Sequence, residues 1–160
     1  MTARISRLLA LSALLLSFAL ASSAQTTFTV NSTSDIVDAS PGDGSCDAGS
    51  GACTLRAAVQ EAGALNTPTT IILPAGLYNL SLFPSCTYFL LDTVNPLVES
   101  MKALCVTSKI TIQGAGAGLT IIDGLATDGL TCCGNYFTNR VVVVDRNGDA
   151  TISGVTFQDG

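Results

Sequence analysis

Short runs of β-branched and aromatic residues, separated by Gly, Asn or Asp, recur along the chain after residue 70. Runs of this length between turn-forming residues are typical of β-strands. They exclude a helical bundle and predict an all-β fold: a solenoid, a barrel or a sandwich. The predicted strands are residues 71–73, 78–80, 110–112, 120–122, 141–144 and 155–157.

The first part of the chain has a different pattern. Residues 26–30 read as one strand, and residues 31–52 read as a loop in which Pro-Gly-Asp-Gly at 41–44 predicts a turn. Apolar residues then follow helical spacing from Leu55 to Leu65, which predicts a short helix. Thr54 is placed to cap the start of this helix, and Asn-Thr-Pro at 66–68 ends it.

An internal repeat favours the solenoid among the three all-β alternatives. The strand patterns that begin at positions 110 and 120 recur at positions 141 and 151, with the same offset for both strands. A period of about 20 to 50 residues is typical of stacked arrays, whose ends need caps. We expect the helix to supply one cap, covering strand edges that would otherwise promote aggregation.

The other end of the expected solenoid has no such cap. The sequence stops at Gly160, shortly after a predicted strand. We therefore expect these residues to be the truncated N-terminal part of a longer protein. A partner chain that covers the end is the alternative.

The N-terminus resembles an export signal. Arg4 and Arg7 precede an apolar run at 8–20, and small residues follow up to Ala24, which is the pattern of a secretory signal peptide. The predicted organisation is a signal peptide at 1–24, a disulfide loop and helix cap at 25–70, and the first solenoid coils at 71–160. Removing the signal lowers Lys plus Arg from 7 to 5 against 12 Asp plus Glu, so the mature net charge is −7. An acidic chain of this kind is not expected to bind nucleic acid, and the mature chain has no second apolar run to span a membrane.

Six cysteines in an exported chain predict disulfides, and six cysteines allow 15 pairings. Cys46 and Cys53 form the safest pair, because the Gly-rich loop between them can fold back. Cys86 and Cys105 bracket one insertion and make a reasonable second pair, whereas adjacent Cys132 and Cys133 can bridge each other only with strain. A zinc site is disfavoured because the chain has no His and no CxxC pair.

The chain resembles the CSLREA-type N-terminal module of bacterial exported proteins with right-handed parallel β-helices. The name-giving segment is CTLRAAV at 53–59, in which Thr54 and Ala57 depart from the letters of the name. The runs IILPAGLYNL at 71–80 and ITIQGAGAGLTIIDG at 110–124 also match, outside insertions at about 81–108 and 125–139. The resemblance implies a pectin-lyase-like β-helix that is exported or displayed on the cell surface. It implies no established catalytic activity for this module.

Four carboxylates in the loop are the sharpest candidate for a binding site. Asp35, Asp38, Asp43 and Asp47 lie close together in the sequence, and oxygen ligands of this kind suit Ca²⁺. Because the spacing is not that of an EF-hand, we favour the alternative that these residues form turns by bonding their own backbone. No other cofactor is expected.

Groups for polysaccharide cleavage are few. The groups considered for this chemistry are Asp123, Asp145, Asp149, Arg140 and Arg146. With the offset of the repeat, Asp123 aligns with Gly154 and Asp145 with Gly114, so the carboxylates do not fall at one position. We assign no catalytic residue. On the cap helix, Arg56 is expected to pair with Glu61 or to cap backbone carbonyls.

The expected function is structural. The module would cap and start a parallel β-helix within a larger cell-surface or secreted protein that contacts a glycan, a host or a neighbouring surface. One alternative is the start of a polysaccharide-degrading, pectate-lyase-like enzyme whose active residues lie in later coils. Another is a Ca²⁺-stabilised binding module that uses the acidic loop.

Overall fold

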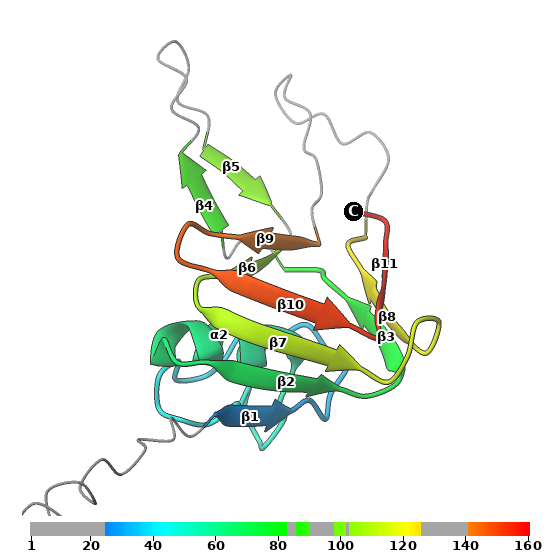
Figure 1. The fold of residues 1–160 in the computed structure, drawn as a ribbon, viewed down its shortest axis with the longest axis horizontal. Helices are drawn as coiled ribbons and strands as arrows, with labels where there is room; N and C mark the ends of the chain where they lie inside the picture. Colours follow the sequence, from blue (N-terminus) through cyan, green and yellow to red (C-terminus); the bar gives the residue numbers. More distant parts are fainter. Residues whose placement is uncertain (1–24, 83–85, 90–97, 102, 126–140) are drawn as a thin grey trace, which may run out of the picture.

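The structure is a computed structural model that describes residues 25–82, 86–89, 98–101, 103–125 and 141–160, with the backbone alone for 86–89 and 98–101. The signal predicted at 1–24 lies outside the described residues. The described part is mostly β with one helix, and it contains parallel sheets and no closed barrel (Figure 1).

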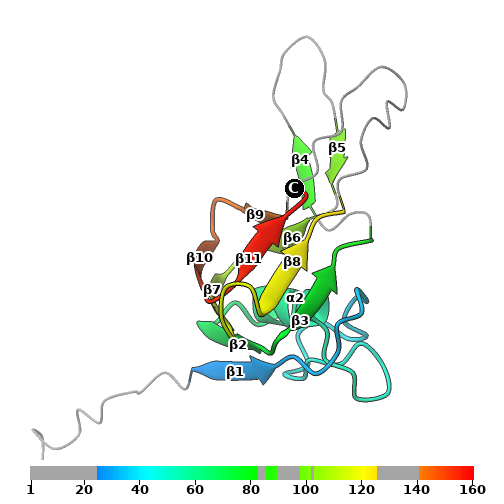
Figure 2. The ribbon, with the colours of Figure 1, turned by 90° about the vertical axis from the view of Figure 1, so that its right-hand side faces the viewer.

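The parallel strands form three sheets. The first sheet has the order β1 (Thr26–Thr29), β2 (Thr69–Leu73), β7 (Lys109–Gly114) and β10 (Asp149–Ser153). The second has the order β11 (Thr156–Gln158), β8 (Thr120–Asp123) and β3 (Gly76–Asn79), seen side by side in Figure 2. The third pairs β6 (Leu104–Val106) with β9 (Val142–Val144). A separate antiparallel pair, β4 (Cys86–Phe89) and β5 (Val98–Met101), lies between β3 and β6 in the sequence.

The chain visits the three sheets in turn. It contributes β2, β3 and β6, then β7, β8 and β9, then β10 and β11, and each new strand lies beside the strand that came one circuit earlier. All these pairings are parallel. The expectation of stacked parallel strands is therefore confirmed at the level of the sheets.

The sequence repeat predicted that the strands beginning at 110 and 120 correspond to those beginning at 141 and 151. This prediction is wrong. Ile110 pairs with Thr69 on one side and with Ala150 on the other, and the partner of Ile121 is Thr156. The segments between strands differ in length, so no single spacing runs through the stack. Because many of the strands are rich in β-branched residues, similarity between them does not identify which ones pair. The segment taken as an insertion at about 81–108 also contains β6, which the sequence did not predict.

Inward-facing residues at the same register position form a row, here called a rank, across the first sheet. Phe28, Ile71, Ile112 and Ile152 share one register position. Phe28, Ile71 and Ile112 are buried, and Ile152 packs half-buried against the same core. Side chains alternate between the two faces of a strand, so this rank follows from one apolar residue at the same alternate position in each strand.

Glycine allows the turns after β7 and β10 to lie directly against each other. The amide of Gly116 donates to the carbonyl oxygen of Gly154 at 3.0 Å. A Cβ atom on Gly114 would lie 2.1 Å from that same oxygen, so the approach excludes any side chain. The Gly-rich run at 114–118 is therefore a packing turn of the stack.

The one described helix, α2 (Leu55–Leu65), confirms the sequence prediction. The Thr54 hydroxyl accepts a hydrogen bond from the Ala57 amide at 3.0 Å and caps the helix N-terminus. Asn66 takes the left-handed conformation at the C-cap, with φ of 51°, and its amide donates to the Ala62 carbonyl. The buried apolar face of α2 packs against β2, β6 and β7.

Candidate functional site

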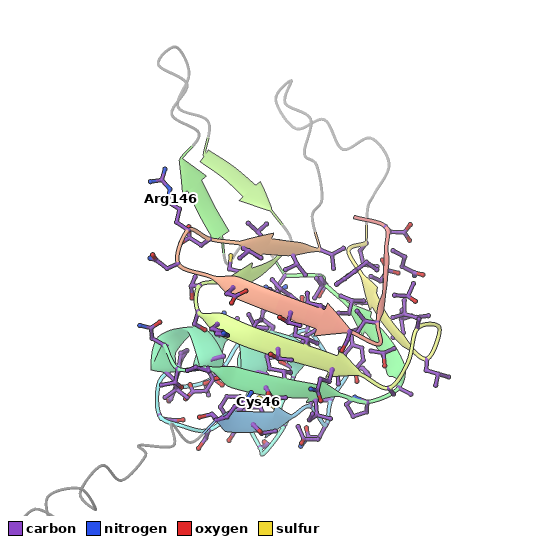
Figure 3. The ribbon with its side chains drawn as sticks, in the orientation of Figure 1. Cys46 and Arg146 are labelled. Atoms are coloured by element: carbon purple, nitrogen blue, oxygen red, sulfur yellow. A yellow bond between two sulfur atoms is a disulfide. The ribbon has the colours of Figure 1, made fainter. Side chains whose placement is uncertain are left out.

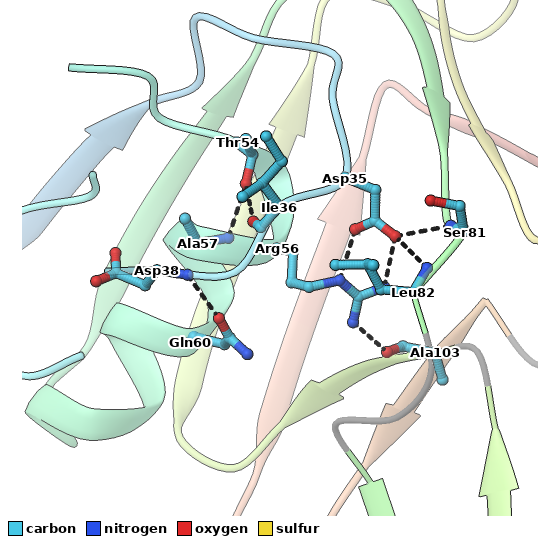
Figure 4. Close-up of polar contacts among 10 residues, drawn as sticks. All are labelled: Asp35, Ile36, Asp38, Thr54, Arg56, Ala57, Gln60, Ser81, Leu82 and Ala103. Atoms are coloured by element: carbon cyan, nitrogen blue, oxygen red, sulfur yellow. Dashed lines mark hydrogen bonds and ion pairs between the residues drawn. The ribbon is translucent and has the colours of Figure 1, made fainter. Parts of the chain in front are cut away.

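A buried ion pair joins α2 to the loop that precedes it (Figure 4). Arg56 Nε lies 2.5 Å from Asp35 Oδ1, and Arg56 Nη2 donates to Asp35 Oδ2 at 3.0 Å. The two side chains are only 1% and 3% exposed. A bidentate pair of this kind is strong and geometrically specific.

The same pair holds two further segments. Asp35 Oδ2 accepts the amides of Ser81 and Leu82, at 2.7 and 2.8 Å, just after β3. Arg56 Nη1 donates to the carbonyl of Ala103 at 3.0 Å, just before β6. The prediction that Arg56 pairs with Glu61 is wrong. The alternative prediction, that Arg56 binds a backbone carbonyl, is confirmed. The pair thus connects the loop, the helix and two sheets at one end of the stack.

Glu61 has a different role on the buried side of the helix. Its carboxylate accepts the amides of Gly42 and Gly44, which belong to the predicted turn at 41–44. Both glycines have positive φ, 100° and 90°, and this lets their amides point to one carboxylate. A buried carboxylate requires such donors, so Glu61 fixes the acidic loop onto α2.

Three of the four loop carboxylates accept hydrogen bonds from backbone amides within the loop. Asp43 accepts from Ser45, Asp47 accepts from Gly49 and Gly51, and Asp38 accepts from Ser40 and Asp47. Asp35 instead forms the ion pair with Arg56. Among the described residues, no group of three or more His, Cys, Asp or Glu side chains is placed to hold a metal ion. The Ca²⁺ site at Asp35, Asp38, Asp43 and Asp47 stays a prediction. The geometry favours the turn alternative for Asp38, Asp43 and Asp47, whereas Asp35 is held by Arg56.

The disulfide between Cys46 and Cys53 is present, with Cα atoms 5.1 Å apart. It closes the loop directly before Thr54, the residue that caps α2. Cys105 is also disulfide-bonded. The described side chains do not include those of Cys86, Cys132 and Cys133, so the predicted pairing of Cys86 with Cys105 stays a prediction.

Tyr78 has a pKa shifted by its surroundings. Its ring is buried in the core, and its hydroxyl donates to the Pro74 carbonyl at 3.0 Å. Burial raises the pKa of the phenol from its ordinary value of 10.0, because the charged phenolate is disfavoured away from water. The shift is explained by packing and requires no catalytic role.

The ionisable residues considered for catalysis are spread over different sheets. Asp123 lies at the end of β8, where it accepts hydrogen bonds from Leu125 and Gln158. It shares its register position with Asn79 and Gln158, so the predicted alignment with Gly154 is wrong. Asp145 follows β9 and accepts from the amide of Arg146, whose exposed side chain points away from the strands (Figure 3). Asp149 lies on β10 with Lys109 at 3.8 Å, in an exposed pair, and Arg140 lies outside the described residues.

A pocket of about 330 Å³ runs along one side of α2. One helical stripe forms its floor, and the acidic loop and the β6 segment form its walls. It is lined by Val37, Pro41, Arg56, Val59, Gln60, Gly63, Ala64, Leu82, Leu104, Cys105 and Thr107. None of these described lining residues carries a carboxylate, and Arg56 is the one charged side chain among them.

No family model, curated protein or solved structure matches this chain. In the part of the chain that the structure describes, no helix is both long enough and apolar enough to cross a membrane. The geometry therefore offers one well-built feature, the buried Asp35–Arg56 pair, and this feature is architectural. Sequence reasoning missed Asp35 as the partner, although the excess of Asp before a lone helical Arg was a usable signal.

Proposed function

We propose that this chain is the sealed start of a right-handed parallel β-helix in an exported protein, of the CSLREA type that the sequence resembles. In this proposal, residues 25–70 close one end of the stack. The following strands begin the coils on which further strands can be added. The role is structural, and the larger assembly contacts a glycan or a neighbouring surface outside the cell.

The observation that carries the proposal is a difference in burial between the two ends of the stack. Val106 in β6 is 1% exposed, and its register partner Val144 in β9 is 46% exposed. Ile122 in β8 is 0% exposed, and its partner Phe157 in β11 is 44% exposed. Equivalent apolar positions are therefore covered at the α2 end and uncovered at the other end.

The satisfied charges in the cap support the same assignment. Arg56, Asp35 and Glu61 are buried with hydrogen-bond partners, and no buried side-chain polar atom among the described residues lacks one. Buried charges are tolerated only with such complete pairing. These buried charges therefore join the loop and the helix to the strands at this end of the stack.

The export part of the proposal rests on the signal-like N-terminus and on the disulfide. It is tested by expressing the full chain in a bacterial host, separating the culture into cytoplasmic and exported fractions, and locating the chain among them. We expect an exported chain that begins at Gln25 and has Cys46 and Cys53 oxidised. Retention in the cytoplasm with an uncleaved N-terminus would contradict the proposal.

Glycan contact is tested on the same exported chain. It is passed over a panel of immobilised neutral and acidic polysaccharides, with binding measured by surface plasmon resonance. We expect saturable binding to at least one of them. Absence of binding to the whole panel would leave the structural role standing and would remove the glycan partner from the proposal.

A further inference from the structure

The turn between β9 and β10 contains the one asparagine of the chain that a glycine follows, Asn147 before Gly148. A hydrogen bond from the Gly148 amide to the Asp145 carbonyl oxygen, at 2.8 Å, closes this turn. We propose that Asn147 is a site of spontaneous deamidation and that its isoaspartate product loosens the junction of β9 and β10. The inference goes beyond the proposed function and does not depend on it.

Asn147 is accessible to solvent in the way that this reaction requires. The residue is exposed, and so are its neighbours Asp145 and Arg146 in the turn. Asn31 is a contrasting case, because its side-chain amide holds the backbone of Gly51 and Cys53. An asparagine fixed in that way cannot turn its side chain toward the following backbone nitrogen.

Packing requires glycine at position 148. A Cβ atom there would lie 2.2 Å from the carbonyl oxygen of Val106, which is too close for any side chain. A larger residue after Asn147 would therefore push the turn away from Val106. Glycine also hinders attack by its own backbone nitrogen less than any other residue, since it has no Cβ. The fold thus maintains the reactive sequence at this turn.

The reaction needs only the protein and water. The Gly148 nitrogen, after losing its proton to hydroxide, forms a bond to Cγ of Asn147, and the side-chain nitrogen leaves as ammonia. Water then opens the five-membered succinimide ring. Breaking the bond from the ring nitrogen to Cγ gives aspartate, whereas breaking its bond to the main-chain carbonyl carbon gives isoaspartate. Overall, one water is consumed and one ammonia is released, with no change in oxidation state.

The hydrogen bond that closes the turn restrains the attack. The Gly148 nitrogen points its proton at the Asp145 carbonyl oxygen, and this bond must break before the nitrogen can reach Cγ of Asn147. Exposed turns open locally at a much lower free energy than the core. The reaction therefore proceeds from molecules in which this turn has opened, while the rest of the fold stays intact.

Isoaspartate would change the length of the turn, because it adds one methylene group to the main chain. The turn is held at both ends. The Asp145 amide donates to the Val106 carbonyl oxygen at 2.9 Å, and the Asp149 amide donates to a second carbonyl, that of Ser108, at 3.1 Å. A longer chain between these two bonds must displace Gly148 from Val106 or break one of them. Aspartate keeps the length of the turn and adds only a charge.

The first test follows deamidation of the purified chain by peptide mass spectrometry during incubation in mildly alkaline buffer. Asn79 is the internal control, since it is also exposed and the amide after it also donates to a carbonyl, at 2.8 Å, but the following residue is Leu80. We expect the side-chain amide to be lost about tenfold faster at Asn147 than at Asn79, a difference of about 1.4 kcal/mol in activation free energy. Asn147→Gln should abolish the loss at this position. Equal rates at Asn147 and Asn79 would overturn the inference.

The second test separates the two products. Isoaspartate is detected with an isoaspartyl methyltransferase, and amide hydrogen exchange then compares the isoaspartate-containing fraction of the incubated chain with Asn147→Asp. We expect exchange in β9 and β10 to be about two- to tenfold faster in that fraction, the effect of losing one hydrogen bond of the turn. Asn147→Asp should exchange as the parent chain does, and α2 should be unchanged in both.

Conversion that yields no isoaspartate would overturn the second half of the inference. So would an isoaspartate fraction that exchanges like Asn147→Asp, because the longer main chain would then have no effect on the junction. These outcomes concern only the turn between β9 and β10. The proposed function fails separately, through cytoplasmic retention of the chain.

Discussion

The two ends of this molecule contain the same kinds of strand but are finished differently. At one end, α2 and its loop cover the strands and satisfy three buried charged side chains. At the other end, residues equivalent in register to core residues lie half-exposed. Strand composition alone therefore does not determine burial, and in this chain the buried polar residues of the helix and loop lie beside the better-covered strands.

The largest expected effect comes from the buried charge at the covered end. Arg56→Met leaves Asp35 buried without its cation and should lower the free energy of unfolding by about 3–5 kcal/mol. The measurement is urea unfolding followed by circular dichroism. Lys109→Met is the matched control, since it breaks the exposed pair with Asp149 and should cost less than about 1 kcal/mol. An equal loss of unfolding free energy in the two variants would show that the buried pair stabilises the fold no more than the exposed pair does.

The next effect compares two isoleucines of one rank. Ile112→Ala creates a cavity in the fully buried core and should lower the free energy of unfolding by about 2–5 kcal/mol. Ile152→Ala changes the same register position at the uncovered end and should cost about half as much, because its side chain already contacts solvent. Thermal or urea unfolding of both variants measures the ratio. A larger cost at Ile152 would mean that the second end is also sealed.

Removing the loop disulfide should have a somewhat smaller effect. Cys46→Ala combined with Cys53→Ala releases a short loop, and the chain-entropy model gives a loss of about 2.5 kcal/mol. The loop packs on α2, so proteolysis of residues 38–53 should become faster while the β10 region is cut at an unchanged rate. Faster cutting at both ends alike would show that the disulfide acts on the whole fold.

The smallest effect is the dependence of stability on alkaline pH. Burial raises the Tyr78 pKa above 10.0 in the folded chain, so folding favours the protonated phenol. Its contribution is complete below pH 10.0, the ordinary phenol pKa, and is lost as the pH rises from there through the folded pKa. Tyr78→Phe should make the unfolding free energy less steep above that pH. The same slope in both proteins would contradict the assignment.

The sequence predicted local structure well where one residue type decides it. Thr54 caps the helix, Asn66 ends it, and the glycines at 42 and 44 form a turn, because each conformation depends on neighbouring atoms. Pairing between strands was predicted less well. Ile110 was matched to Val141 because both begin β-branched runs, yet segment lengths bring Ile110 beside Thr69 and Ala150.

The candidate site shows the same limit. Arg56 was expected to pair with Glu61, which follows it on the same helix. Instead Asp35, from the loop well before the helix, reaches the guanidinium, and Glu61 turns to two glycine amides. Helical spacing gives neighbours along one helix, but the path of a loop that folds back over that helix is set by packing and by the disulfide.

The most direct test of this difference between the two ends is amide hydrogen exchange on the purified chain. We expect slow exchange in α2, β2 and β7 and fast exchange in β9, β10 and β11, because local opening begins where apolar contacts are fewest. Exchange that is fastest in α2 and the loop before it, with β9 to β11 protected, would contradict the claim that this end of the stack is the sealed one.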